Sequence, residues 1–142
     1  MYRCASCGTF NRVPPEPPSG QPTCGRCKAT LDTTGAPQEV DGEAFERAVS
    51  GAPVPVVVDL WAPWCGPCRT AARVLEKIGT QLKGRAVVLK VNTDEHPAPS
   101  ARLGVRGIPT FIVFRDGREA ARQSGTMPAP AFSRWLAQNG VS

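Results

Sequence analysis

The chain of 142 residues is long enough for one ordinary domain and a small additional module. Its apolar content of 41% and charged content of 20% are typical of globular proteins, and no apolar run approaches the roughly 18 residues that a transmembrane helix needs. The net charge of +5 is scattered, which argues against a dedicated nucleic-acid-binding surface. The first residues lack the basic and then apolar pattern of a signal peptide, so we expect a cytoplasmic protein whose thiols stay reduced.

Residues 1–31 form a segment with its own cysteines and few apolar side chains. It contains two Cys-x-x-Cys pairs, which are Cys4 with Cys7 and Cys24 with Cys27. Residues 13–22, between the pairs, are too rich in proline for a helix or a central strand, so we expect a loop there. A segment this short and polar cannot bury enough surface to fold alone and needs a staple such as a metal.

The spacing of the two pairs falls inside the range of four-cysteine zinc sites, in which thiolates surround the ion tetrahedrally. Gly8 and Gly25 favour tight turns at the two pairs. We therefore predict one structural zinc ion, held by all four cysteines in a small zinc-ribbon-like module. Disulfides within the segment and an iron site are the alternatives, and a reducing cytoplasm disfavours the disulfides.

Residues 32–40 have the composition of a linker, and a second domain is predicted over residues 41–142. Asp41 suits the N-cap of its first helix, and Asp116-Gly117 is a strong hairpin signal. The predicted elements are, in chain order, a helix from 41 to 51, a buried strand over 54–60, a helix that begins at the next cysteine pair and runs to about 82, a strand over 86–91, a short helix ending near 103, strands over 111–114 and 118–124, and a helix opened by Pro128. This order predicts an α/β fold with a central mixed β-sheet flanked by helices on both faces.

Cys65 and Cys68 lie where a strand is followed at once by a helix, the context in which a Cys-x-x-Cys pair indicates a redox site. On a helix, residues three apart face the same side, at about 5–6 Å between Cβ atoms, so small rotations can join the sulfurs in a disulfide. The N-terminus of a helix stabilises a thiolate, which favours Cys65 as nucleophile and Cys68 as the residue that resolves the mixed disulfide. Gly66 permits close approach of a substrate, and Pro67 stiffens the turn.

Three side chains beside this pair are further candidates for the site. Asp59 is a carboxylate within an apolar strand. If it is buried, its pKa is raised and it can exchange protons near neutral pH; the alternative is an exposed edge position. Trp61 and Trp64 flank the cysteines and either offer an apolar surface to a docking polypeptide or serve as core aromatics.

The segment Val58-Asp59-Leu60-Trp61-Ala62-Pro63-Trp64-Cys65-Gly66-Pro67-Cys68 resembles the active-site segment of thioredoxins. Gly107-Ile108-Pro109-Thr110 resembles the second signature of that family, and Asp116-Gly117 and Gly125 match its late turn and glycine. The resemblance covers roughly residues 40–142. Together with the four N-terminal cysteines, the chain is similar to the thioredoxin 2 subgroup, whose members carry zinc.

The resemblance implies the thioredoxin fold and dithiol–disulfide exchange with disulfide-containing proteins. It also implies re-reduction by an NADPH-linked thioredoxin reductase. For the site it implies that Pro109 follows a cis peptide bond and lies against the disulfide, and that Ile108 supports the site and substrate docking. It further implies that Lys90 lies near Asp59 and that Asp59 assists Cys68 by proton transfer. We expect a monomer, with no organic cofactor and no membrane or nucleic-acid partner.

Two other functions are compatible with the sequence. One is a disulfide isomerase or oxidase of the same fold, although Gly66-Pro67 resembles the reducing members of the family. The other is a zinc-ribbon binding protein that uses the redox domain as a scaffold. The zinc module itself is either a passive stabilised extension or a redox sensor that loses its metal on oxidation.

Overall fold

The computed structural model describes residues 1–14 and 20–142, so the loop predicted over residues 13–22 lies partly outside the described residues. The helices are α1 (Gly42–Gly51), α2 (Gly66–Leu82), α3 (Pro97–Leu103) and α4 (Ala129–Gln138). The strands are β1 (Tyr2–Arg3), β2 (Phe10–Asn11), β3 (Gln38–Glu39), β4 (Val56–Trp61), β5 (Val87–Asn92), β6 (Thr110–Arg115) and β7 (Arg118–Ser124). Each element predicted after residue 41 is present, with small shifts at its ends. Across the two described ranges, no helix combines the length and apolar character needed to span a bilayer.

A five-stranded mixed sheet forms the centre of the molecule, in the order β3-β5-β4-β6-β7. Strand β4 pairs in parallel with β5 and antiparallel with β6, so the prediction of a central mixed sheet is confirmed. Strand β3 lies inside the predicted linker and pairs in parallel with β5 at the edge of the sheet. The sequence did not indicate this strand, because two residues are too few to show a periodic pattern.

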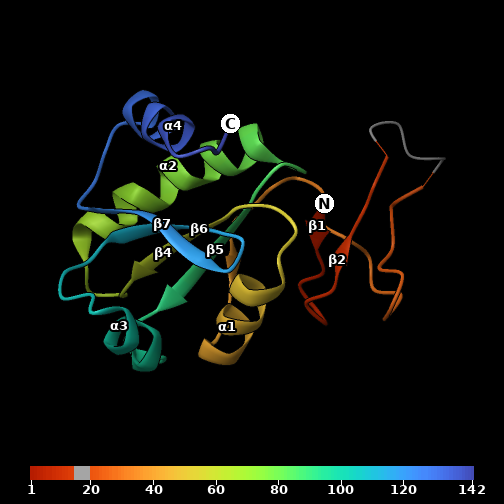
Figure 1. The fold of residues 1–142 in the computed structure, drawn as a ribbon, viewed down its shortest axis with the longest axis horizontal. Helices are drawn as coiled ribbons and strands as arrows, with labels where there is room; N and C mark the ends of the chain where they lie inside the picture. The colour runs from red at the N-terminus through yellow and green to blue at the C-terminus, as the bar shows by residue number, and fades with distance from the viewer. Residues whose placement is uncertain (15–19) are drawn as a thin grey trace.

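Each face of the sheet carries its own hydrophobic core. Helices α1 and α3 cover one face, and α2 and α4 cover the other (Figure 1). Because successive side chains of a strand point to opposite faces, β4 contributes to both cores. Val56, Val58 and Leu60 pack on the α1 side, whereas Val57 packs on the α2 side. Strand β4 is therefore buried on both faces, as its continuous apolar run predicted.

Two local predictions are confirmed by the hydrogen bonds and backbone angles. The Asp41 carboxylate accepts a hydrogen bond of 2.7 Å from the backbone N–H of Ala44 and caps α1. Asp116 and Gly117 adopt φ angles of 53° and 77° in the turn between β6 and β7. Positive φ at both central positions is the geometry that matches the right-handed twist of a two-stranded hairpin.

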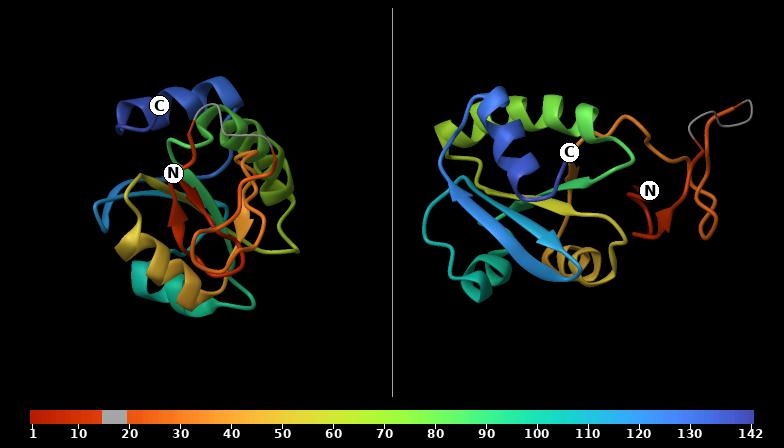
Figure 2. Two further views of the ribbon diagram at one scale, coloured as in Figure 1. Left: turned by 90° about the vertical axis from the view of Figure 1, so that its right-hand side faces the viewer. Right: turned by 45° about the horizontal axis from the view of Figure 1, so that its top comes forward.

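The N-terminal segment packs beside the sheet near the C-terminal end of α2 (Figures 1 and 2). Strands β1 and β2 pair antiparallel, and Thr23 bridges Thr30 in the second half of the segment. The Met1 ammonium donates to the carbonyl oxygen of Gly84 at 2.7 Å, and Phe10 packs against the core beneath α1. The segment is thus fixed to the domain at the end of α2 that lies away from Cys65.

A contact between two glycines holds the connecting segment against α2. A Cβ atom added at Gly79, on the buried face of α2, would collide with the carbonyl oxygen of Gly35. A Cβ atom at Gly35 would collide with the carbonyl of Gly79, and the φ of Gly35 is +83°. Only glycine fits at this crossing, because the two backbones approach directly.

We expect Gly79→Ala to lower the free energy of unfolding by about 1–3 kcal/mol, because overpacking at a backbone contact forces the chain to shift. Denaturant unfolding of the full chain measures the effect. Gly51→Ala is the matched control, since Gly51 also lies in a helix and a Cβ there meets nothing within 4 Å. Equal stability of the two variants would contradict the prediction.

Candidate active site and metal centre

The redox pair lies at the start of α2, directly after the central strand. Cys65 is the N-cap of the helix and Cys68 faces its buried side. The two are joined in a disulfide with a Cα–Cα distance of 5.3 Å. The backbone N–H of Cys68 points at the Cys65 sulfur at 3.2 Å, and Pro67 occupies the first turn. A donor N–H and the positive end of the helix dipole therefore meet at Cys65, where a thiolate would form on reduction.

The loop before β6 lies across from the disulfide. The Cys65 sulfur is 3.9 Å from the carbonyl oxygen of Ile108, and the Ile108–Pro109 peptide bond is cis. The backbone N–H of Gly125, at the end of β7, donates to the carbonyl oxygen of Pro109 at 2.9 Å. Three residues that the resemblance implied for the site are thus brought together with Cys65.

The two tryptophans differ in exposure. Trp64 is 70% exposed, and among the described residues it is the large hydrophobic side chain that is exposed to solvent. Its indole N–H donates to the Asp94 carboxylate at 3.2 Å. Trp61 is half-buried, and its indole N–H donates to the Glu39 carboxylate at 3.1 Å. Trp64 is therefore a surface side chain beside the disulfide, and its interpretation as a core aromatic is wrong.

Asp59 is fully buried, so the alternative of an exposed edge position is wrong. Its side chain shares the face of β4 with Val57, which is the face that α2 covers. Neither carboxylate oxygen has a hydrogen-bond partner among the residues that the structure describes. Burial raises the pKa of Asp59 to about 7, although the positive charge of Lys90 opposes this shift. The group can therefore gain or lose a proton near neutral pH.

Lys90 lies beside Asp59, as the resemblance implied. The two residues are register partners in the parallel pair β4–β5. The Lys90 ammonium lies 4.7 Å from the centroid of the Trp61 ring, over its face, in a cation–π contact. Lys90 thus contacts the indole of Trp61, and its positive charge acts on the buried carboxylate of Asp59.

The four N-terminal cysteines form one cluster. Their sulfurs all lie within 4.8 Å of one another, and none of the four is in a disulfide. Cys4 and Cys27 have their sulfurs 3.6 Å apart, and so have Cys7 and Cys24. Four thiolates at about 2.3 Å from a tetrahedral zinc ion would lie about 3.8 Å apart. The cluster fits a metal ion of this type, and the alternative of disulfides is not observed.

Each Cys-x-x-Cys pair is closed by the same hydrogen bond. The N–H of Gly8 donates to the carbonyl of Cys4 at 2.8 Å, and the N–H of Lys28 donates to that of Cys24 at 3.0 Å. Gly8 and Lys28 have φ angles of 81° and 67°. The prediction that Gly25 provides the second turn is therefore corrected, because the left-handed position belongs to Lys28 one residue after the pair.

The environment of the cluster favours a thiolate on Cys24 and on Cys7, whereas burial and the neighbouring cysteines raise the pKa of Cys27 to about 11. Backbone N–H groups, above all that of Cys27, lower the pKa of the Cys24 thiol to about 6. Metal binding requires the deprotonated form, so the four thiols would release protons when a metal binds. Arg3 is 8% exposed, and its guanidinium adds a positive charge beside Cys4.

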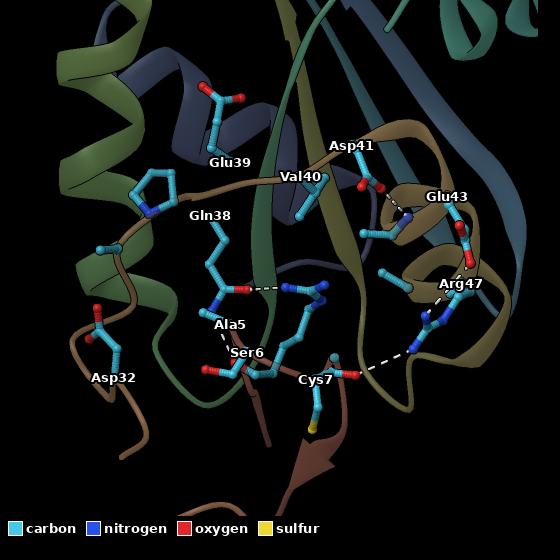
Figure 3. A pocket seen from close by; sticks show the side chains of 16 residues that line it. Ala5, Ser6, Cys7, Asp32, Gln38, Glu39, Val40, Asp41, Glu43 and Arg47 are labelled. Atoms are coloured by element: carbon cyan, nitrogen blue, oxygen red, sulfur yellow. Dashed lines mark hydrogen bonds and ion pairs between the residues drawn. The ribbon is translucent and has the colours of Figure 1, made fainter. Parts of the chain in front are cut away.

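A polar cleft of about 550 Å³ separates the cysteine module from the domain (Figure 3). Arg3 donates to the Gln38 side chain at 2.7 Å, and Gln38 donates back to the Arg3 carbonyl at 2.9 Å. On the other side of the cleft, Arg47 of α1 donates to the carbonyl of Cys7 at 3.3 Å. Polar contacts from β3 and α1 thus hold the module in place.

Sequence reasoning missed three side chains of these sites, which are Arg3, Glu39 and Asp94. Arg3 contacts the missed strand β3, Glu39 belongs to that strand, and Asp94 lies in a polar loop. No local pattern marks any of them, because their partners are distant in the chain.

The fold and the two cysteine sites define a class of protein. A disulfide at the N-terminus of a helix, a cis-proline loop beside it and a buried carboxylic acid behind it are the parts of a dithiol–disulfide oxidoreductase.

Comparison with known proteins agrees with this class. The family model "Thioredoxin" matches residues 36–138, and the model "Thioredoxin 2, N-terminal", a zinc ribbon, matches residues 3–29. Thioredoxin C-3 of Corynebacterium nephridii is 38% identical over 135 residues, which cover 95% of this chain and 92% of the relative. Thioredoxin 1 of a Nostoc species is 42% identical over 71% of this chain and 94% of its own length. Thioredoxin of Rhodospirillum rubrum is 42% identical over 70% and 95%.

The chain belongs to the thioredoxin family and carries the N-terminal module of the thioredoxin 2 subgroup. It is a thioredoxin-type protein-disulfide reductase, and members of this family act on protein disulfides and are served by reductases. Its four-cysteine cluster is a metal-binding module.

We expect the stability of the oxidised protein to fall as the pH rises from about 4 to about 7. The pKa of Asp59 is raised from 3.8 to about 7, so the native state keeps a proton that the unfolded chain loses in this window. The full difference corresponds to ~4 kcal/mol as an upper bound. Asp59→Asn should remove this pH dependence and stabilise the protein above pH 7, as measured by denaturant unfolding at a series of pH values.

Glu43→Gln is the control for this prediction, because Glu43 is an exposed carboxylate on α1. It should leave the pH profile unchanged. A profile for Asp59→Asn that is parallel to that of the parent protein would show that Asp59 titrates normally.

Proposed function

We propose that Cys65 attacks the disulfide of a substrate protein and that Cys68 resolves the mixed disulfide. The observation that carries the proposal is the position of Cys65 at the N-cap of α2, with the N–H of Cys68 directed at its sulfur. This arrangement lowers the free energy of a thiolate on Cys65, and the thiolate is the attacking species.

The exchange proceeds in two steps from the reduced protein. The Cys65 thiolate forms a bond to one substrate sulfur, and the substrate disulfide breaks to release its other sulfur as a thiolate, which takes a proton. The thiol of Cys68 then loses its proton to Asp59 and attacks the Cys65 sulfur. The second substrate sulfur leaves, and the two electrons of the dithiol have passed to the substrate. Asp59 suits this role because its carboxylate is buried and its pKa lies near 7.

The remaining site residues take supporting roles in the proposal. Trp64 provides an apolar surface for a docking polypeptide, and Ile108 and Pro109 line the opposite side of the disulfide. Gly125 holds the carbonyl of Pro109, and Gly66 leaves room for substrate, since a Cβ there would meet nothing within 4 Å. An NADPH-linked thioredoxin reductase returns the pair to the dithiol form.

Zinc is the metal that we propose for the cluster of Cys4, Cys7, Cys24 and Cys27. Four thiolate ligands and no open position are typical of structural zinc, which would supply folding free energy and no catalytic chemistry. Residues 1–31 would act as the metal module, residues 32–40 as the connection that also contributes β3, and residues 41–142 as the redox domain. The proposal further assigns the protein to the cytoplasm as a monomer.

We expect Cys65→Ser to reduce insulin-disulfide reduction, assayed with a thioredoxin reductase and NADPH, to below about one per cent of the parent rate. Cys68→Ser should instead trap a covalent mixed disulfide between Cys65 and the substrate, detectable by mass spectrometry. The control is Cys27→Ser, which alters an exposed ligand of the metal cluster and should keep most of the activity. A substrate adduct on Cys68 in Cys65→Ser would reverse the assigned roles.

Elemental analysis of the full chain, purified without added metal, should find about one zinc ion per chain. Cys24→Ser removes a fully buried ligand and should reduce the bound zinc by at least about tenfold, because three-thiolate sites are open to water. Iron in place of zinc, or metal-free protein with disulfides among the four cysteines, would contradict the assignment.

A further inference from the structure

Three charged side chains form a row across the sheet behind the redox site. Glu39 of β3 is the register partner of Lys90 of β5, and Lys90 is the register partner of Asp59 of β4. Register partners in a parallel pair point to the same face of the sheet. Glu39 and Asp59 therefore flank Lys90 on the face that α2 covers, and the positive charge of Lys90 lowers the pKa of both carboxyl groups.

Glu39 also contacts the active-site indole directly. Its carboxylate accepts the hydrogen bond of 3.1 Å from the N–H of Trp61, and the ring of Trp61 carries the Lys90 ammonium on its face. Glu39 thus contacts the edge of the Trp61 ring, and Lys90 contacts the face of the same ring. The contact fixes the indole in one orientation, since a half-buried indole N–H needs a partner.

Gln38, the residue before Glu39 in β3, points to the other face of the sheet. Gln38 and Glu39 leave the strand in opposite directions (Figure 3). Gln38 exchanges two hydrogen bonds with Arg3 of the metal module. Because side chains alternate along the strand, Gln38 contacts the metal module and Glu39 contacts Trp61 of the redox site.

We propose that Glu39 is a positioning residue of the redox site, which holds the indole of Trp61 and shares the ammonium group of Lys90 with Asp59. The proposal rests on the proposed role of Asp59 as proton carrier. It extends the site to the edge strand β3, which lies outside the sequence motif of the family segment.

The charges around the two carboxylates agree with this assignment. Burial is the main cause that raises the pKa of Asp59, Lys90 lowers it, and the negative charge of Glu39 raises it further. Burial also raises the pKa of Glu39, opposed by the Trp61 hydrogen bond and by Lys90. Glu95 and His96, from the loop after β5, are the other titratable groups that act on Glu39.

Glu39→Gln separates the charge from the hydrogen bond, because the amide keeps an acceptor oxygen. Loss of the charge removes a repulsion from Asp59 and leaves the positive charge of Lys90 to act on Asp59 alone. Both effects lower the pKa of Asp59. Glu39→Ala removes the acceptor as well, so it should also change the environment of the Trp61 indole.

The test is an NMR titration of the side-chain carboxyl carbons in the oxidised full chain. The titration midpoint of Asp59 should shift to lower pH in Glu39→Gln and stay unchanged in Glu43→Gln, which removes one exposed negative charge from α1. The Trp61 indole N–H resonance should move in Glu39→Ala and be restored in Glu39→Gln. An Asp59 midpoint that is the same in the parent protein and Glu39→Gln, or that shifts equally in Glu43→Gln, overturns the proposal.

A measurement on the unmodified protein makes the test independent of how the variants fold. The Trp61 indole N–H resonance should follow the titration of its acceptor Glu39, and a resonance that does not change with pH overturns the proposal. Because these readouts do not depend on turnover, they remain valid if Asp59 proves not to carry a proton. That separate failure would appear as normal reduction rates in Asp59→Asn.

Discussion

The redox site depends on the register of one strand. Strand β4 is central and alternates strictly, so its odd and even positions supply two different cores. Asp59 occupies a position of the α2 face, where its neighbours along the strand are apolar and where α2 removes water. A shift of one residue would send the carboxylate to the α1 side and take it away from the helix that carries Cys68. Burying an unpaired carboxyl group is unfavourable in free energy. The packing of β4 on both faces offsets this free energy and holds Asp59 in place.

One sequence motif serves two chemistries in this chain because its backbone setting differs. At Cys65 the motif opens a helix, so a free N–H and the helix dipole act on a single sulfur. At Cys4 and Cys24 the motif forms a tight turn, and the residue that follows the second cysteine has a left-handed backbone conformation. The two turns direct their four sulfurs to one point. The first setting holds a redox-active disulfide and the second holds a metal-binding cluster. Because the spacing is the same in all three pairs, the contrast comes from the backbone conformation after the second cysteine of each pair.

Much of this was predictable from the sequence, and the exceptions share a cause. The helices, the main strands, the disulfide and the buried carboxylate of Asp59 each carry a local signal, such as an apolar run or a motif. The strand β3 and the partners Arg3, Glu39 and Asp94 carry none, because their roles arise only when distant segments pack together. The prediction that Gly25 provides the second turn was wrong for a different reason, since Lys28 occupies the left-handed position. A glycine within a turn suggests the left-handed position, but only the hydrogen-bond pattern decides which residue occupies it.

The position of the cysteine module has a consequence for the six cysteine sulfurs of the chain. The module is fixed near the C-terminal end of α2, whereas the disulfide is at its N-terminal end (Figure 1). A helix of 17 residues is about 25 Å long, far beyond bonding distance for sulfur. The glycine crossing at Gly35 and Gly79 keeps the connecting segment from swinging the module toward the other end. The cysteines of the cluster are therefore too far away to exchange with the Cys65–Cys68 disulfide of the same molecule.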